Sequence, residues 1–188
     1  GDWSSDVCSS DLSMPLELME AYRKRTGEQP SFTAFVVNCL GGAISKHDHL
    51  HAYQNWRGQL VIYENVNVGT MIEIQWNGSR VPMPYVFKDA NRKDYLILNQ
   101  ELRNAQRNPL ETPAAKLTPT LLAFPGVIRR IVYWVINRIP RLFRKDSSPV
   151  LVTAVGMFGK GGGWGIPKPS QTLTVTLGGI EKKPAVHE

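Results

Sequence analysis

Three closely spaced histidines form one group of residues in this sequence that could do chemistry. His47, His49 and His51 alternate in the run HDHLH, and imidazoles gathered on one side of a strand could bind a metal ion. No acidic or thiol ligand completes a set, and the alternative is a polar, half-exposed turn between a helix and a strand. The sequence favours the turn, and we expect no metal here.

Cys39 is a second candidate for a chemical role, because a thiolate can act as a nucleophile. It lies in an apolar stretch that follows Pro30, and Ser31 is a candidate N-cap for a helix there. The apolar side chains recur at helical spacing and comprise Phe32, Phe35, Val36, Cys39, Leu40, Ala43 and Ile44. We therefore predict that Cys39 is an inert residue of the buried core.

Two expected strands near the end of the chain carry hydroxyl side chains. Val150–Val155 alternates over two faces and is ended by Gly156, and Thr172–Leu177 alternates again. The loop between them is rich in glycine, which lets the backbone pass close to another surface. It lacks the G-x-x-x-x-G-K-[ST] spacing and leads into a strand, so we do not expect a phosphate-binding loop.

These strands and their loop resemble a known family. The run VTAVGMFGKGGGWGIPKPSQTLTVTLGGIEKKP is similar to the catalytic domain of the 2-oxoacid dehydrogenase acyltransferases, the dihydrolipoamide acyltransferase components. In that family a T-I-S-x-L-G strand precedes a glycine-containing loop, and a later strand ends near G-x-I-x-x-K-P. Val152–Gly156 and Gly178–Pro184 occupy those places here. The resemblance spans most of residues 14–188 and is loosest over 109–149.

The resemblance implies a fold and a reaction. The expected fold is α+β and chloramphenicol-acetyltransferase-like, a two-layer sandwich in which helices pack on a mixed sheet. The expected reaction moves an acyl group between coenzyme A and a dihydrolipoyl-type thiol, without a metal. The family forms a homotrimer or a larger core and works with a lipoyl domain and other subunits of the dehydrogenase complex.

The family's catalytic groups can be sought in this chain. A histidine base in an H-x-x-x-D-G motif and the serine hydroxyl of T-I-S-x-L-G, an oxyanion donor, come from neighbouring subunits. Alignment on Gly156 places Thr153 at that serine, so Thr153 is the candidate donor. An ordinary strand threonine of high β propensity is the alternative, and both interpretations stay open.

The histidine base has no counterpart in the sequence. No H-x-x-x-D-G motif occurs, and His187 is followed only by Glu188. We expect the catalytic histidine beyond Glu188, a domain truncated at both ends, and no catalysis by the chain as given. Two alternative functions remain open: a chloramphenicol-type O-acetyltransferase, which shares the fold, and a non-catalytic trimeric core or scaffold protein.

The remaining elements must hold these strands in place. The sequence predicts helices over 14–25, 31–44 and 94–106, and strands over 59–63, 66–74 and 81–87. Asn77 and Gly78 indicate a hairpin. Pro82 and Pro84 favour an edge strand, because proline cannot donate to a central ladder. The inward side chains expected of the third helix are Tyr95, Leu98, Leu102 and Ala105.

A variant helical segment at about 118–145 departs from the family. One side of its helical wheel carries Ile128, Ile131, Val132, Val135, Ile139, Leu142 and Phe143, and the other carries Arg129, Arg130, Arg138, Arg141, Arg144 and Lys145. This pattern is typical of a helix at a membrane surface, with contact through 119–145. It is equally typical of a helix that covers a hydrophobic patch or a neighbouring subunit.

The first twelve residues are set aside. Residues 1–12 resemble a translated sequencing adapter, and a disordered leader is the alternative. The domain is then 13–188, a partial acyltransferase catalytic domain. Without Asp2, Asp6 and Asp11, 22 basic residues stand against 13 acidic ones, since 16 minus 3 is 13, and the net charge rises to +9.

Composition limits the partners and the compartment. With Cys8 set aside, Cys39 alone cannot form an internal disulfide, so a cytoplasmic location is expected. No apolar run reaches the roughly 20 residues that a membrane-spanning helix needs. A basic chain can bind nucleic acid, but no nucleic-acid-binding motif occurs, so we expect no such partner and interpret the charge as a solvated surface.

Overall fold

The computed structural model describes residues 11–54, 58–76, 78–109, 125–128, 130, 148–154 and 171–180. The helical elements are α1 (Ser13–Thr26), α2 (Phe32–Ile44), the 3-10 helix η1 (Asp48–His51) and α3 (Tyr95–Arg107). The strands are β1 (Ala52–Gln54), β2 (Leu60–Ile62), β3 (Val68–Trp76), β4 (Ser79–Phe87), β5 (Val150–Ala154) and β6 (Leu173–Leu177).

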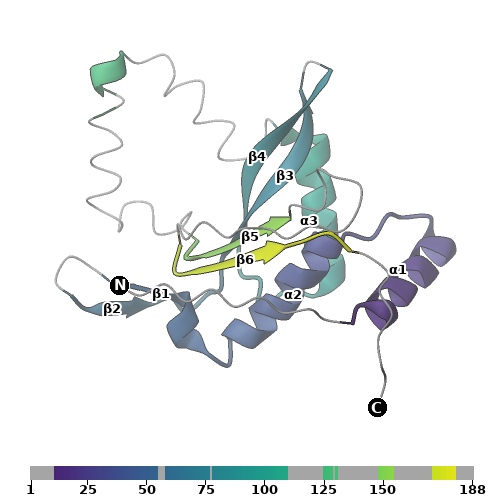
Figure 1. The fold of residues 1–188 in the computed structure, drawn as a ribbon, viewed down its shortest axis with the longest axis horizontal. Coiled ribbons are helices and arrows are strands. Elements are labelled where there is room, and N and C mark those ends of the chain that lie inside the picture. Colours follow the sequence, from purple (N-terminus) through teal and green to yellow (C-terminus); the bar gives the residue numbers. More distant parts are fainter. Residues whose placement is uncertain are drawn as a thin grey trace.

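The main sheet has four strands in the order β4-β3-β5-β6 (Figure 1). β3 and β4 are antiparallel, whereas β3 with β5 and β5 with β6 are parallel. Helices α2 and α3 pack on one another and against this sheet. A mixed sheet packed by helices confirms the α+β fold that the sequence predicts.

Local sequence signals explain where the helices begin. The Ser31 hydroxyl accepts a hydrogen bond from the Ala34 N–H (3.3 Å), and the Asp94 carboxylate accepts one from the Ile97 N–H (3.0 Å). Both are N-caps that satisfy a free amide of the first turn. α1 ends at Gly27, whose φ of 73° is the left-handed conformation that glycine adopts without strain.

The hairpin between β3 and β4 also follows the sequence. Trp76 is the register partner of Ser79, and Gly78 has a φ of 77°. β4 lies at the edge of the sheet. The backbone N–H groups that Pro82 and Pro84 lack are therefore not missing from a central strand. The predicted hairpin and edge strand are confirmed.

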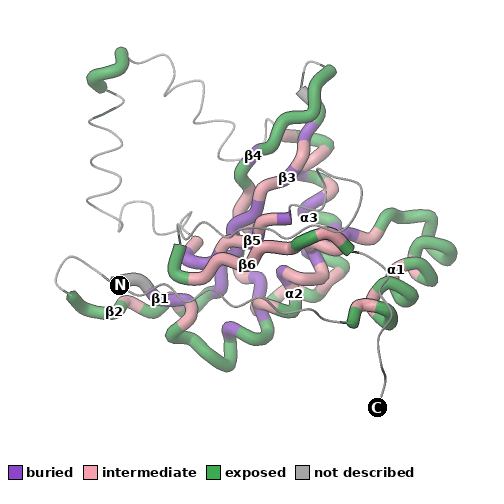
Figure 2. Tube along the Cα trace, viewed as in Figure 1, coloured by how far each residue is buried: buried purple, intermediate pink, exposed green. Residues whose placement is uncertain are grey.

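One face of the sheet forms the hydrophobic core with α2 and α3. The buried cluster joins Val150 and Val152 of β5 to Val68 and Ile72 of β3, and it includes Ala34, Val37, Leu98 and Leu102 of the helices. Leu173, Val175 and Leu177 of β6 pack against it. Figure 2 shows the buried residues gathered where α2 and α3 meet the strands. For α3, the inward positions Leu98, Leu102 and Ala105 are confirmed.

The buried face predicted for α2 is right for Ile44, and Val36 and Leu40 pack half-buried against the core, but Cys39 is misplaced. The buried residues of α2 are Ala34, Val37, Gly41 and Ile44, and Cys39 is exposed. A Cβ added to Gly41 would lie 2.6 Å from the carbonyl oxygen of Ala90, so only glycine permits this close approach of helix and backbone. Cys39 therefore points away from the core, although partial desolvation still raises the pKa of its thiol.

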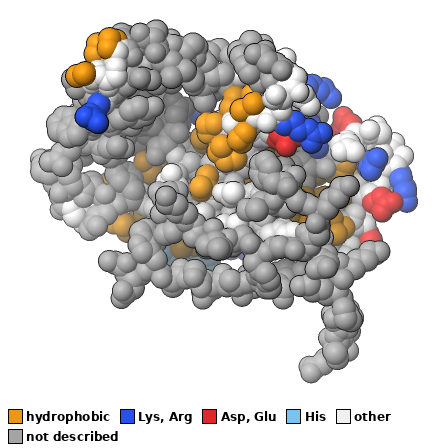
Figure 3. Space-filling view, turned by 45° about the horizontal axis from the view of Figure 1, so that its top comes forward, with side chains coloured by type: hydrophobic (Ala, Val, Ile, Leu, Met, Phe, Trp, Pro, Cys, Tyr) orange, Lys and Arg blue, Asp and Glu red, His pale blue; other side chains and the backbone are white. Residues whose placement is uncertain are grey.

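Several apolar side chains remain at the surface. They include Met14 and Leu18 of α1, which has no buried residue, and Leu60 and Ile62 of β2. The space-filling view shows apolar side chains in the middle of one face, beside basic and acidic side chains (Figure 3). Among the residues described, no helix is long and apolar enough to cross a membrane.

Several predictions concern residues outside the described part of the chain. The glycine-rich loop, His187 and residues 1–10 belong to this group. The variant segment at 118–145 belongs to it too, except for 125–128 and Arg130, which are exposed. Its membrane contact therefore stays a prediction.

Candidate functional site

Thr153 lies near the carboxyl end of β5, on the side of the sheet away from the helices. Its neighbours Val152 and Ala154 are buried, and side chains alternate between the two faces of a strand. Thr153 itself is half-buried. We call its side of the sheet the open face. Within the described ranges, the Thr153 hydroxyl has no hydrogen-bond partner.

A second threonine stands directly beside Thr153. The parallel register of β5 and β6 pairs Thr153 with Thr176, so both side chains lie on the open face. Figure 2 shows β6 half-buried along its whole length. The Thr176 hydroxyl also has no partner among the residues that the structure describes. The carboxyl ends of these strands thus present, side by side, two hydroxyl groups that bind none of the described residues.

At the opposite, amino ends of the parallel strands, Ser148 makes hydrogen bonds that hold two of the strands together. Its hydroxyl accepts a hydrogen bond from the Gly69 N–H (2.7 Å) and lies 2.7 Å from the Asn67 carbonyl oxygen, to which it donates. The Val150 carbonyl oxygen is a further acceptor within reach. One residue later, the Pro149 carbonyl accepts from the Leu173 N–H (3.1 Å). Ser148 therefore fixes the beginning of β5 against β3.

His51 lies at the same amino end of the parallel strands. The Asn67 N–H donates to Nε2 of His51 (3.0 Å), which places the proton of the neutral ring on Nδ1. His51 is 1% exposed, and burial lowers the pKa of its imidazole. The ring also contacts Tyr63 edge to face, with centroids 5.3 Å apart. The sequence indicated a half-exposed turn here, which is wrong for His51.

The other two histidines form no site with it. The rings of His47 and His49 lie edge to face with centroids 5.9 Å apart, and both residues are exposed. In the described part of the chain, no group of histidine, cysteine, aspartate or glutamate side chains could hold a metal ion.

The histidines also lie far from Thr153 and Thr176. The Thr172 hydroxyl donates to the carbonyl oxygen of Ala52 (2.8 Å), the residue after His51. Thr176 follows Thr172 by four residues, or about 13 Å along a strand. None of the three clustered histidines is therefore placed to serve as a base for a reaction at Thr153.

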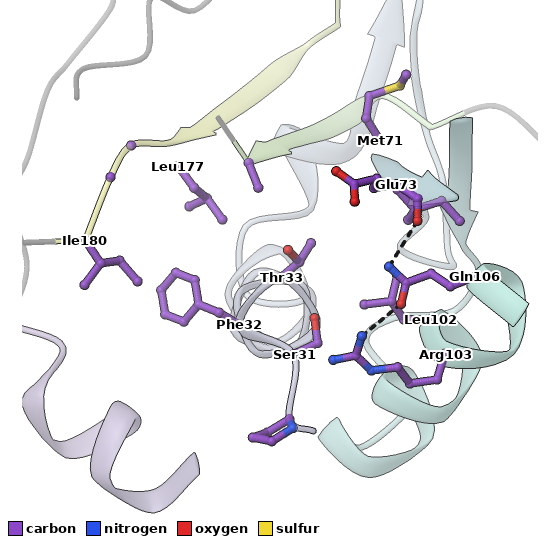
Figure 4. Close-up of a pocket in the computed structure, with 15 residues that line it drawn as sticks. Ser31, Phe32, Thr33, Met71, Glu73, Leu102, Arg103, Gln106, Leu177 and Ile180 are labelled. Atoms are coloured by element: carbon purple, nitrogen blue, oxygen red, sulfur yellow. Dashed lines mark hydrogen bonds between the residues drawn. The ribbon is translucent and has the colours of Figure 1, made fainter. Parts of the chain in front are cut away.

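A cleft of about 410 Å³ lies on the helical side of the sheet. Figure 4 shows Phe32, Leu102 and Leu177 on its walls, with Arg103 donating to Gln106 (2.9 Å). Gln106 in turn donates to the backbone oxygen of Glu73 (3.4 Å), and Arg103 donates to the carbonyl of Gln29 (3.0 Å). Ala154 lines this cleft, so Thr153 faces the other way. Gln106 thus joins α3 to β3, and Arg103 joins α3 to the loop before α2.

Thr176, Ser148 and the burial of His51 were not found from the sequence. One signal for Thr176 was present: the threonines at 172, 174 and 176 recur every second residue, which places them on one side of a strand. The register that sets Thr176 beside Thr153 spans the glycine-rich loop, and no local pattern encodes it.

Comparison with known proteins shows what this fold is similar to. No family model and no curated protein matches the sequence. A solved structure of a probable dihydrolipoamide acetyltransferase from Listeria monocytogenes matches with a TM-score of 0.59 and 15% identity, over 92% of this chain and 61% of that chain. The dihydrolipoamide acetyltransferase of Azotobacter vinelandii matches with a TM-score of 0.53 and 11% identity, over 86% of this chain and 56% of that one.

A third match comes from an assembled core. The structure is the cubic core of the pyruvate dehydrogenase multienzyme complex, with a TM-score of 0.52 and 11% identity. It is matched over 81% of this chain and 52% of that chain. The protein thus has the fold of the dihydrolipoamide acyltransferase catalytic domains, as the sequence resemblance predicts. The chain spans between half and two thirds of the length of these structures.

Proposed function

We propose that this domain binds an acyl-coenzyme A and transfers the acyl group to a dihydrolipoyl-type thiol. The observation that carries the proposal is the free hydroxyl of Thr153 at the carboxyl end of a central strand. The residue also aligns with the serine of the family's T-I-S-x-L-G strand. The similarity in fold to dihydrolipoamide acetyltransferases supports the same reaction class.

In this reaction Thr153 would donate a hydrogen bond to the oxygen of the acyl group. A thiolate attacks the carbonyl carbon of the thioester, and the electron pair of the carbonyl π bond moves to oxygen. The tetrahedral intermediate then re-forms the carbonyl and expels the thiolate of coenzyme A, which takes up a proton. A fixed hydroxyl that donates to the developing oxyanion lowers this barrier, because its dipole is already oriented.

The reaction also needs a base to deprotonate the attacking thiol. The sequence contains no H-x-x-x-D-G motif, and the clustered histidines lie at the other end of β6. We therefore expect the chain 1–188 to bind substrate without turning it over. We further propose that the protein acts in the cytoplasm as a homotrimer or larger core, with a lipoyl domain and dehydrogenase-complex subunits as partners.

Titration calorimetry with acetyl-coenzyme A tests this function. We expect the chain to bind it and Thr153→Val to weaken binding roughly twofold to tenfold, the value of one hydrogen bond. Thr153→Ser, which keeps the hydroxyl, should retain the affinity. Absence of binding by the unaltered chain would overturn the proposed function.

A turnover assay complements the calorimetry. Acetyl transfer from acetyl-coenzyme A to dihydrolipoamide should stay at the rate of the blank, because no base is supplied. Turnover well above the blank would show that the chain holds a base of its own and would contradict the assignment.

A further inference from the structure

Four described threonines in or next to the paired strands β5 and β6 differ in what their hydroxyl groups can reach. The hydroxyl of Thr172 already donates to the Ala52 carbonyl (2.8 Å), so this proton is not available to a ligand. The Oγ1 atom of Thr174 is fully buried and has no partner within the described residues. Thr153 and Thr176 are half-buried, and neither hydroxyl is bound to a described residue. Among these four threonines, Thr153 and Thr176 are therefore the pair that can meet a ligand.

The strand register fixes the pair geometrically. Thr153 and Thr176 are direct register partners in a parallel ladder, and neighbouring strands lie about 4.8 Å apart. Both residues are one position from the carboxyl end of their strand. The β-branched side chains hold stiff rotamers on this pleated surface, so the two hydroxyls are positioned before any ligand arrives.

We propose that Thr176 is a second hydrogen-bond donor to the acyl carbonyl oxygen, acting together with Thr153. This inference rests on the proposed function. A carbonyl or oxyanion oxygen has lone pairs for two donors, and two hydroxyls about one strand spacing apart can both point at one oxygen between them. Neither hydroxyl gives up its proton, so the balance of the acyl transfer is unchanged.

Infrared difference spectroscopy tests the pair without requiring turnover. Acetyl-coenzyme A labelled with carbon-13 at its carbonyl is bound to the unaltered chain and to variants, and the carbonyl stretching band is compared. Each lost donor raises the frequency, because a hydrogen bond weakens the carbonyl bond. We expect Thr176→Val to shift the band to higher wavenumber, as Thr153→Val does, and the double variant to shift it furthest.

Two variants serve as matched controls. Thr176→Ser keeps the hydroxyl and should restore the band of the unaltered chain. Thr174→Val removes the buried hydroxyl two residues earlier on the same strand and should leave the band in place. Thermal unfolding of each variant establishes that the fold is retained before spectra are compared.

The outcomes separate the two proposals. A chain that does not bind acetyl-coenzyme A overturns the proposed function and this inference with it. Binding with a band that Thr153→Val shifts and Thr176→Val leaves unmoved overturns the role of Thr176 alone. A shift with Thr174→Val equal to that with Thr176→Val would also overturn it, because the effect would then not depend on which hydroxyl can reach the ligand.

Discussion

The two ends of the parallel strands β3, β5 and β6 are built differently. At the amino end, the hydroxyls of Ser148 and Thr172 are bound to backbone groups, and the ring of buried His51 accepts from the Asn67 amide. At the carboxyl end, Thr153 and Thr176 carry hydroxyls that bind none of the described residues. The same residue type thus joins strands at one end and is free to bind a ligand at the other.

This difference separates residues that maintain the fold from residues that can bind. A hydroxyl that satisfies a backbone amide contributes stability, since an unpaired buried amide costs free energy. A half-exposed hydroxyl without a partner is solvated and contributes little. Substitutions at the two ends should therefore have opposite effects on stability and on ligand binding.

The largest expected effect is on Ser148. Ser148→Ala removes the hydrogen bond that the Gly69 amide donates to Ser148 and the one that Ser148 donates to the Asn67 carbonyl, so we expect a loss of about 1 to 3 kcal/mol in the free energy of unfolding. Urea denaturation followed by circular dichroism measures it. Thr153→Ala is the matched control and should stay within about 0.5 kcal/mol of the unaltered chain. Equal losses would abolish the distinction between the two ends.

A smaller effect is expected at Thr172. Thr172→Val removes one hydrogen bond to the Ala52 carbonyl while keeping the shape of the side chain, which should cost about 0.5 to 1.5 kcal/mol. Thr176→Val, four residues later in the sequence, removes a hydroxyl without a described partner and should be close to neutral. A Thr176 variant that is less stable than the Thr172 variant would show that Thr176 is structural.

The smallest effect at neutral pH concerns His51. Burial lowers the pKa of His51 in the folded chain, so the unfolded chain binds the proton more readily. Stability should therefore fall as the pH drops below about 6.5, the ordinary histidine value, and level off below the folded pKa. Urea midpoints between pH 7.5 and 5 measure this. His51→Gln should lose this part of the pH dependence; an unchanged profile would contradict the assignment.

Local sequence signals predicted much of this fold. The caps Ser31 and Asp94, the Asn77–Gly78 turn and the prolines of β4 act within a few residues, so their structural effect can be inferred from the sequence. The orientation of α2 could not be predicted, because its sequence is apolar on nearly every side. Contact of Gly41 with the backbone at Ala90 decides which side is buried, and that contact joins distant segments.

The candidate site was predicted only in part for the same reason. Thr153 was identified through its place relative to Gly156, a short-range pattern. Thr176 and Ser148 depend on parallel pairing of strands that are far apart in the sequence. The burial of His51 likewise depends on Asn67, which approaches it only in the folded chain.

The most direct test observes both ends of the strands in one titration. Threonine methyl groups labelled with carbon-13 report local binding by nuclear magnetic resonance as acetyl-coenzyme A is added. We predict that the Thr153 and Thr176 signals move with the ligand concentration while the Thr172 signal stays in place. Signals that all remain fixed, or a shift confined to Thr172, would contradict it.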